Sequence, residues 1–184
     1  KPLESDLCRR LAMDISRGME YLHSKRMVHG DLKSPNVLLT RGFQAKISDF
    51  GTVRTTTEFT TMTTTAVQAV SSMSLKWAAP EILNQHETTQ SSDVYSYGII
   101  VWEILTRKVP WEEVRRPVDI MLKVLSGKRP QGLQEDNSHG PCSDMRQVME
   151  KCWVETPKER PSFKDVVGFL EDEGQNLSPI PPRL

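Results

Sequence analysis

Cysteines and long apolar runs are both scarce in this sequence. Its three cysteines, Cys8, Cys142 and Cys152, are too few and too irregularly spaced for a disulfide framework or a zinc site. We therefore expect reduced thiols and a cytoplasmic location. The longest apolar run covers residues 99–102, which is far too short to cross a bilayer, and the first residues contain no apolar signal segment. These absences argue against a secreted, disulfide-stabilised protein and against a membrane protein.

A net charge is absent as well. The chain of 184 residues holds 24 acidic and 24 basic side chains, so its formal charge at neutral pH is zero. Without a basic field, the composition does not favour binding to nucleic acid or to an anionic membrane. A chain of this length can bury about 70% of the surface that its unfolded form exposes. We expect one domain with a substantial hydrophobic core.

Against this neutral background, residues 29–36 concentrate chemically active side chains. They read His-Gly-Asp-Leu-Lys-Ser-Pro-Asn, and Asp49 follows thirteen residues after Asn36. The oxygen atoms of Asn36 and Asp49 suit Mg²⁺, which usually takes only one or two ligands from protein when phosphates supply others. Asp31 is the natural general base toward a hydroxyl. In an extended segment Lys33 shares a side with Asp31, so the cation can hold this base and meet a γ-phosphate.

Two short apolar-rich segments separate the two acids. Residues 36–40 and 44–48 flank a sequence, Arg41-Gly42-Phe43, that contains the glycine typical of a hairpin turn. Such a hairpin brings Asn36 and Asp49, at its two open ends, close together. Two metal ligands that are distant in the sequence would then face one site.

The order of these motifs resembles that of the protein kinases. Residues 29–36 resemble the catalytic loop of the family, and Asp49-Phe50-Gly51 resembles its metal-binding triplet. Further matches are Ala79-Pro80-Glu81 at the end of the activation segment, residues 92–98 at the start of a central buried helix, and residues 158–162 at a late arginine motif. The resemblance implies a kinase domain over residues 1–175, with the activation segment at residues 49–81.

This resemblance also implies roles for residues outside the catalytic loop. Glu81 and Arg160 would form a buried ion pair that fixes the substrate-side loop. Asp93 would hold the backbone of the catalytic loop from below. Ser74 would help to hold the general base. The implied cofactors are ATP and Mg²⁺, and the implied partner is a protein substrate.

His29 differs from the other three histidines. The resemblance places it in a stacked core beside Phe50 and Gly51, so packing explains it better than proton transfer does. The remaining histidines stand singly in the sequence, and we expect them in surface or loop positions: His23, His86 and His139.

Apolar periodicity predicts a mainly α fold, α+β overall, with one short β-hairpin. The resemblance of the motifs implies that this fold is the large lobe of a protein kinase. Helices are expected at residues 5–24, 91–106, 118–125, 144–152 and 163–171. The helix at 91–106 is apolar nearly all round, which predicts a central position, with Ser91 or Ser92 as its cap. Residues 176–184 are expected to form an extended, proline-rich tail.

Part of the kinase pattern is missing. The chain has no Gly-x-Gly-x-x-Gly phosphate loop, and residues 1–6 hold no strand lysine with a helical glutamate partner. We therefore expect the ATP-binding small lobe to be absent, and the surface that it normally covers to be apolar and exposed.

A second departure concerns regulation. Gly30 replaces the arginine that reads a phosphate on the activation segment of related kinases. Phosphorylation of the threonine-rich residues 55–65 is therefore expected to activate weakly or not at all. The alternative is that these threonines form a flexible linker.

Specificity and activity each leave two interpretations open. Lys33 and Ser74 match serine/threonine kinases, whereas Lys76-Trp77 resembles tyrosine kinases, and the mixture indicates the tyrosine-kinase-like group of serine/threonine kinases. A tyrosine or dual-specificity kinase is the alternative. The intact catalytic loop favours an ATP-dependent enzyme. The missing small lobe favours a non-catalytic module that binds protein partners, or a lobe that works with a small lobe or another kinase in trans.

Overall fold

The computed structural model describes residues 5–55, 74–85, 88–133 and 143–172. These residues form six α-helices and four short strands: α1 (Ser5–Ser24), β1 (Met27–Val28), β2 (Val37–Leu39), β3 (Ala45–Ile47), β4 (Arg54–Thr55), α2 (Pro80–Gln85), α3 (Gln90–Thr106), α4 (Pro117–Leu125), α5 (Ser143–Cys152) and α6 (Phe163–Glu171). Short 3-10 turns lie between them: η1 (Ser34–Asn36), η2 (Phe50–Thr52), η4 (Leu75–Trp77) and η6 (Pro157–Glu159). The predicted fold class, mainly helical with a small hairpin, is confirmed.

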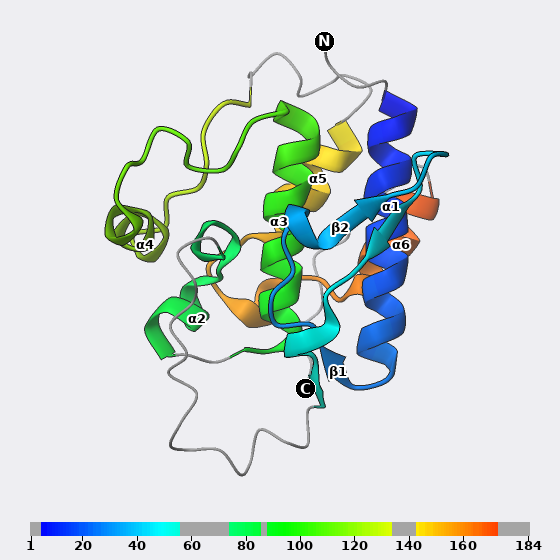
Figure 1. Ribbon diagram of the computed structural model, residues 1–184, viewed down its shortest axis with the longest axis horizontal. Helices are drawn as coiled ribbons and strands as arrows, with labels where there is room; N and C mark the ends of the chain where they lie inside the picture. The colour runs from blue at the N-terminus through cyan, green and yellow to red at the C-terminus, as the bar shows by residue number, and fades with distance from the viewer. Residues whose placement is uncertain (1–4, 56–73, 86–87, 134–142, 173–184) are drawn as a thin grey trace.

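Helix α3 passes through the centre of the molecule, with α5 behind it and α1 and α6 to one side (Figure 1). Every residue from Ser92 to Trp102 is buried, which explains why the helix is apolar nearly all round. The cap expected at Ser91 or Ser92 is wrong, because Thr89 precedes the first turn and its hydroxyl accepts from the Ser92 N–H. The Ser92 hydroxyl in turn accepts from the Thr89 N–H, which completes a capping box.

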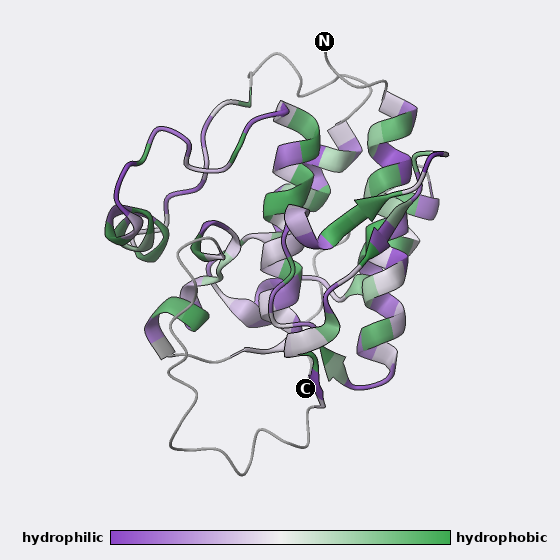
Figure 2. Cartoon of the chain, in the orientation of Figure 1, coloured by the Kyte–Doolittle hydropathy of each residue, from purple (hydrophilic) through white to green (hydrophobic). Residues whose placement is uncertain are grey.

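Helix α1 packs along α6 on one side and against β3 and α3 on others. Its buried residues recur at three- or four-residue steps, so the helix has one apolar face and one polar face (Figure 2). Arg9 extends from α1 to the opposite helices, where it donates to the Asp144 carboxylate and to the Leu170 carbonyl. These two contacts join α1 to the start of α5 and to the end of α6.

Strands β2 and β3 form the predicted antiparallel hairpin beside α1. Val37 pairs with Ile47, and Leu39 pairs with Ala45. The Ala45 N–H donates to the Asp14 carboxylate of α1 at 3.0 Å, which fixes the hairpin to the helix. A second antiparallel pair, β1 with β4, was not predicted, because two residues per strand are too few to show a periodic pattern.

Some predictions concern residues that lie outside the described ranges. These are Cys142, His86, His139, the threonines from 56 to 65, the domain boundary at 175 and the proline-rich tail.

Cys8 and Cys152 are both buried, and burial raises the pKa of the Cys152 thiol, so this sulfur stays protonated at neutral pH. In the described part of the chain, no helix combines the length and apolar character needed to cross a membrane.

Gly98 marks the closest approach of α3 to α5. A Cβ atom at this position would lie 3.0 Å from the Cβ of Cys152 and 3.2 Å from the backbone nitrogen of Trp153. Backbone cannot move aside as the end of a flexible side chain can, so the helices pack at this distance only with glycine here. Gly168 in α6 provides a contrast, because a Cβ there meets no atom within 4 Å.

We predict that Gly98→Ala lowers the free energy of unfolding by about 1–3 kcal/mol, because the methyl group overpacks the α3–α5 contact. Gly168→Ala should instead raise it by about 0.5–1 kcal/mol, because alanine is the better helix former. Urea denaturation of both variants measures these changes. Equal effects of the two substitutions would contradict a tight contact at Gly98.

Candidate active site

Residues 29–36, the predicted catalytic loop, hold an acid and a cation side by side. Lys33 Nζ donates to Asp31 Oδ2 at 2.6 Å and to the Ser74 hydroxyl at 2.9 Å. Both members of the ion pair are only partly exposed, at 20% for Asp31 and 14% for Lys33. Lys33 therefore orients the Asp31 carboxylate and joins it to Ser74, which lies 41 residues further along the chain.

Asn36 lies against the same carboxylate. Its Nδ2 donates to the Asp31 carbonyl at 2.8 Å and to Asp31 Oδ2 at 3.3 Å, and the residue is buried. These contacts use the amide nitrogen and leave the amide oxygen as the atom that can bind a cation. A hard oxygen of this kind fits Mg²⁺.

The hairpin brings Asp49 to the same end of the structure. The Ser48 N–H donates to the Asn36 carbonyl at 2.8 Å, and the Ser48 hydroxyl donates to the same carbonyl at 3.0 Å. Asp49 follows immediately with a φ of 61°, a left-handed conformation that costs a non-glycine residue about 1–2 kcal/mol. Strain of this kind is concentrated at functional sites. Asn36 directly precedes β2 and Asp49 follows shortly after β3, so the two candidate Mg²⁺ ligands lie at the same open end of the hairpin.

A metal at this site would have few protein ligands. Within the described ranges, no group of three His, Cys, Asp or Glu side chains comes together. One carboxylate and one amide match the small number of protein ligands that Mg²⁺ takes beside phosphates. The donor set therefore fits phosphate-bound Mg²⁺ better than a metal held by protein alone.

Asp93 supports the catalytic loop from below. Its Oδ2 accepts from the His29 N–H at 2.8 Å, and its Oδ1 accepts from the Gly30 N–H at 2.9 Å. The residue is 2% exposed, so these bonds replace its lost hydration. His23 Nε2 lies 2.9 Å from Asp93 Oδ2 and completes the set.

The expectation of a surface or loop position for His23 is wrong. It lies in the last turn of α1, its side chain is 10% exposed, and its ring meets Phe163 edge-on at 5.0 Å. The Asp93 carboxylate draws the ring inward, and no sequence spacing reveals that contact. His23 is therefore a supporting residue that sequence reasoning missed.

His29 is fully buried and structural in its contacts. Its Nδ1 accepts from the Asp31 N–H at 3.3 Å, and its Nε2 lies 3.2 Å from the Ser48 carbonyl. One neutral tautomer, with the proton on Nε2, satisfies both contacts. The ring centroid lies 5.8 Å from that of Phe50, and the hydroxyl of Thr52 donates to the His29 carbonyl. Thr52, one residue after Gly51, is a further contact that the sequence did not predict.

Gly30 has a backbone conformation that favours glycine. Its φ is +78°, and a Cβ would lie 3.3 Å from the Thr88 methyl group and 3.4 Å from the Thr52 carbonyl oxygen. The backbone conformation of this turn therefore favours glycine at position 30.

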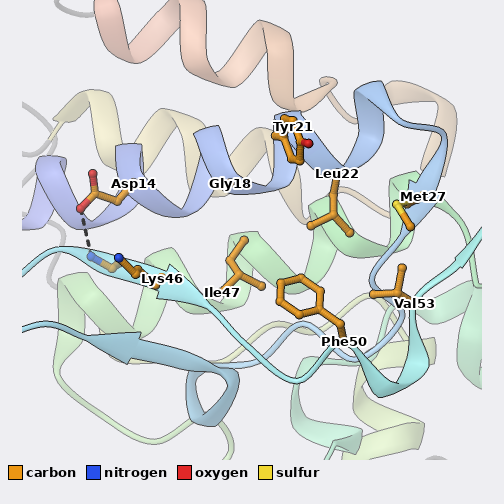
Figure 3. Close-up of a pocket in the computed structure, with 10 residues that line it drawn as sticks. Asp14, Gly18, Tyr21, Leu22, Met27, Lys46, Ile47, Phe50 and Val53 are labelled. Carbon is orange, nitrogen blue, oxygen red and sulfur yellow. Dashed lines mark hydrogen bonds between the residues drawn. The ribbon is translucent and has the colours of Figure 1, made fainter.

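An apolar pocket of about 620 Å³ opens beside Phe50, between α1 and β3 (Figure 3). Phe50, Ile47 and Leu22 face into it, and Met27 and Val53 line one end. Phe50 is 53% exposed and Tyr21 at the rim is 66% exposed. An apolar surface with exposed side chains is thus present next to the Asp49 turn.

Glu81 and Arg160 form a buried, two-pronged ion pair. Arg160 Nη1 donates to Glu81 Oε1 at 2.6 Å, and Nη2 donates to Oε2 at 2.9 Å. Arg160 also donates to three backbone carbonyls, those of Val154, Glu155 and Ser91. The pair joins the start of α2 to the segment between α5 and α6.

Glu103 of α3 is another residue that the sequence analysis did not select. Its carboxylate accepts from the Ser34 hydroxyl at 2.9 Å and from Trp77 Nε1 at 2.8 Å. Burial raises the pKa of Glu103 to about 6, although both hydrogen bonds and nearby Lys76 lower it. The available signal was a single acid that interrupts the apolar run at 99–102.

Comparison with known proteins identifies the family of this chain. The family described as "Protein tyrosine and serine/threonine kinase" matches residues 1–170. The chain is 41% identical over 160 residues to RGS domain-containing serine/threonine-protein kinase A of Dictyostelium discoideum. It is 36% identical over 167 residues to serine/threonine/tyrosine-protein kinase HT1, and 33% identical over 179 residues to serine/threonine-protein kinase CTR1, both of Arabidopsis thaliana. The chain therefore belongs to the protein tyrosine and serine/threonine kinase family.

These matches cover most of this chain but a small part of each relative. They include 87%, 88% and 95% of the chain, and 13%, 39% and 21% of the three relatives in the same order. The chain thus corresponds to part of a kinase domain. Two of these relatives are named as serine/threonine-protein kinases and one as a serine/threonine/tyrosine-protein kinase.

We predict that Arg160→Met lowers the free energy of unfolding by about 3–5 kcal/mol, because it leaves the Glu81 carboxylate buried without a cation. The matched control is Arg17→Met, which breaks the Arg17–Glu171 pair, whose side chains are 57% and 50% exposed. That change should cost about 0–1 kcal/mol. Urea denaturation separates the two cases, and a small loss in both would contradict a stabilising role for the buried pair.

Proposed function

We propose that this chain provides the catalytic and substrate-binding lobe of a protein serine/threonine kinase. The observation that carries this proposal is the contact of Lys33 with both Asp31 and Ser74, beside Asn36. It supplies an oriented carboxylate, a cation and an oxygen ligand in one place. These are the requirements of phosphoryl transfer from a nucleotide to a hydroxyl.

The residues divide the chemistry among themselves. Asp31 accepts the proton of the attacking hydroxyl, and Lys33 stabilises the negative charge on the transferred phosphoryl group. Asn36 and Asp49 would hold Mg²⁺, which neutralises the phosphate charge of ATP when it is bound. Asp93 and His29 position the loop that carries the acid, the cation and the amide, which are Asp31, Lys33 and Asn36.

Ser74 supports serine and threonine hydroxyls of proteins as the substrate class. Its hydroxyl accepts from Lys33 at 2.9 Å and so fixes the cation beside the general base. Trp77 and Lys76 leave tyrosine specificity as the alternative. HT1, a relative of this chain, is named a serine/threonine/tyrosine-protein kinase, which supports keeping both specificities open. The sparse cysteines favour action in the cytoplasm.

The apolar pocket beside Phe50 supports a second candidate function, a non-catalytic lobe that binds a protein partner. Exposed apolar side chains here cost solubility unless another polypeptide covers them. The partner that best fits both candidates is a kinase small lobe, supplied by the same longer protein or in trans. It would cover Phe50 and exclude water from the nucleotide.

Calorimetric titration with Mg·ATP tests the proposal. We expect binding by the chain when a small lobe of a relative such as HT1 is supplied, with weaker binding by the chain alone. Asp49→Ala should weaken it by about 10–100-fold, the effect of losing one charged contact. Asp172→Ala, an exposed acid after α6, is the matched control and should leave affinity unchanged.

The outcomes separate the two candidate functions. Nucleotide binding that depends on Asp49 supports the enzyme. Binding of the small lobe without any nucleotide binding would identify a non-catalytic module. Equal losses in Asp49→Ala and Asp172→Ala would contradict the assignment of Asp49 as the metal ligand.

A further inference from the structure

Glu103 lies between two segments that build opposite sides of the candidate site. Its Oε1 accepts from the hydroxyl of Ser34, the residue directly after Lys33. Its Oε2 accepts from the indole N–H of Trp77, three residues after Ser74. One carboxylate on the central helix therefore binds the catalytic loop and the η4 turn at the same time.

The contacts of Glu103 add a second connection between the two segments that Lys33 already joins. Lys33 joins the loop to Ser74 directly, at 2.9 Å, while Glu103 joins the loop to the same turn through Ser34 and Trp77. The second connection is anchored to α3, whereas the first is not. Together, the two connections hold Lys33 and Ser74 at a fixed distance from each other and from the central helix α3.

We propose that Glu103 is a positioning residue that holds the catalytic loop and the η4 turn in register through Ser34 and Trp77. This inference rests on the proposed kinase function, because it concerns the geometry of Asp31 and Lys33 for that reaction. Glu103 acts through these neighbours and does not itself touch a substrate.

The raised pKa of Glu103 makes its contribution to stability depend on pH. Burial raises the pKa of Glu103 to about 6, above its ordinary value, so the folded state favours the protonated form. Its contribution to stability is therefore greatest below the ordinary pKa and is lost as the pH rises through about 6. At neutral pH the carboxylate is mostly ionised and this contribution is absent.

Protonation changes the two contacts in a defined way. The ionised carboxylate accepts from both Trp77 and Ser34, whereas the acid carries a proton on one oxygen, which weakens that oxygen as an acceptor. Lys76, on the η4 turn, is the charged side chain whose field acts on this group. Glu103→Gln keeps the shape and one good acceptor but cannot titrate, so it should resemble the protonated form at every pH.

The test is a pH titration of the full chain by ¹H–¹⁵N NMR, without nucleotide. In the wild type, the indole signal of Trp77 and the amide signals of Lys33 and Asn36 should move together, with a midpoint at about 6. In Glu103→Gln this shared transition should disappear.

Two single-contact variants separate positioning from local titration. Ser34→Ala should leave the Trp77 transition in place, with a higher midpoint because one hydrogen bond that lowers the pKa is lost, but the loop amides should no longer follow it. Trp77→Phe should leave the loop transition in place. These signals need no catalysis, so a failure of Mg·ATP binding does not decide them.

Two results would overturn the proposal. The first is a Trp77 transition near pH 6 with no movement of the Lys33 and Asn36 amides. The second is a loop transition that persists in Glu103→Gln.

Discussion

The arrangement of the site depends on one buried carboxylate, that of Asp93. Removing an ion from water costs several kcal/mol, and here the cost is offset by three donors, the backbone N–H groups of His29 and Gly30 and the ring of His23. Because both oxygens are engaged, the carboxylate has one orientation, and the loop backbone has one position above it. The directions of Asp31 and Lys33 follow from that backbone.

The same helix extends this support along its length. At 3.6 residues per turn, Asp93, Ser96 and Glu103 fall within a sector of about 80° on α3. Ser96 donates to the Trp77 carbonyl at 2.9 Å, and Glu103 binds the Trp77 indole and Ser34. A helix that is otherwise apolar and buried therefore carries one polar face, and that face holds both segments that form the site.

The sequence was sufficient for whatever depends on local pattern or on an ordered set of motifs. Periodicity predicted α1, α3 and the later helices, and the turn glycine predicted the β2–β3 hairpin. It was not sufficient for contacts between distant residues with no repeating pattern, such as His23 with Asp93 or Ser34 with Glu103. The cap of α3 was misplaced because Ser91, Ser92 and Thr89 all have capping side chains, and only the backbone shows which one precedes the first turn. The roles of Asp49 and Asn36 in binding metal stay predictions from the motif and from their positions at the hairpin ends.

The most direct test of the account is hydrogen exchange at the amides of His29 and Gly30, compared between the wild type and Asp93→Asn. If the carboxylate holds the loop, both amides exchange slowly in the wild type and about 10–100-fold faster in the variant, the effect of losing charged hydrogen bonds. The Val166 amide of α6, far from the loop in sequence, should keep its rate. Unchanged exchange at His29 and Gly30 would contradict the account, because it would show that the loop holds its position without Asp93.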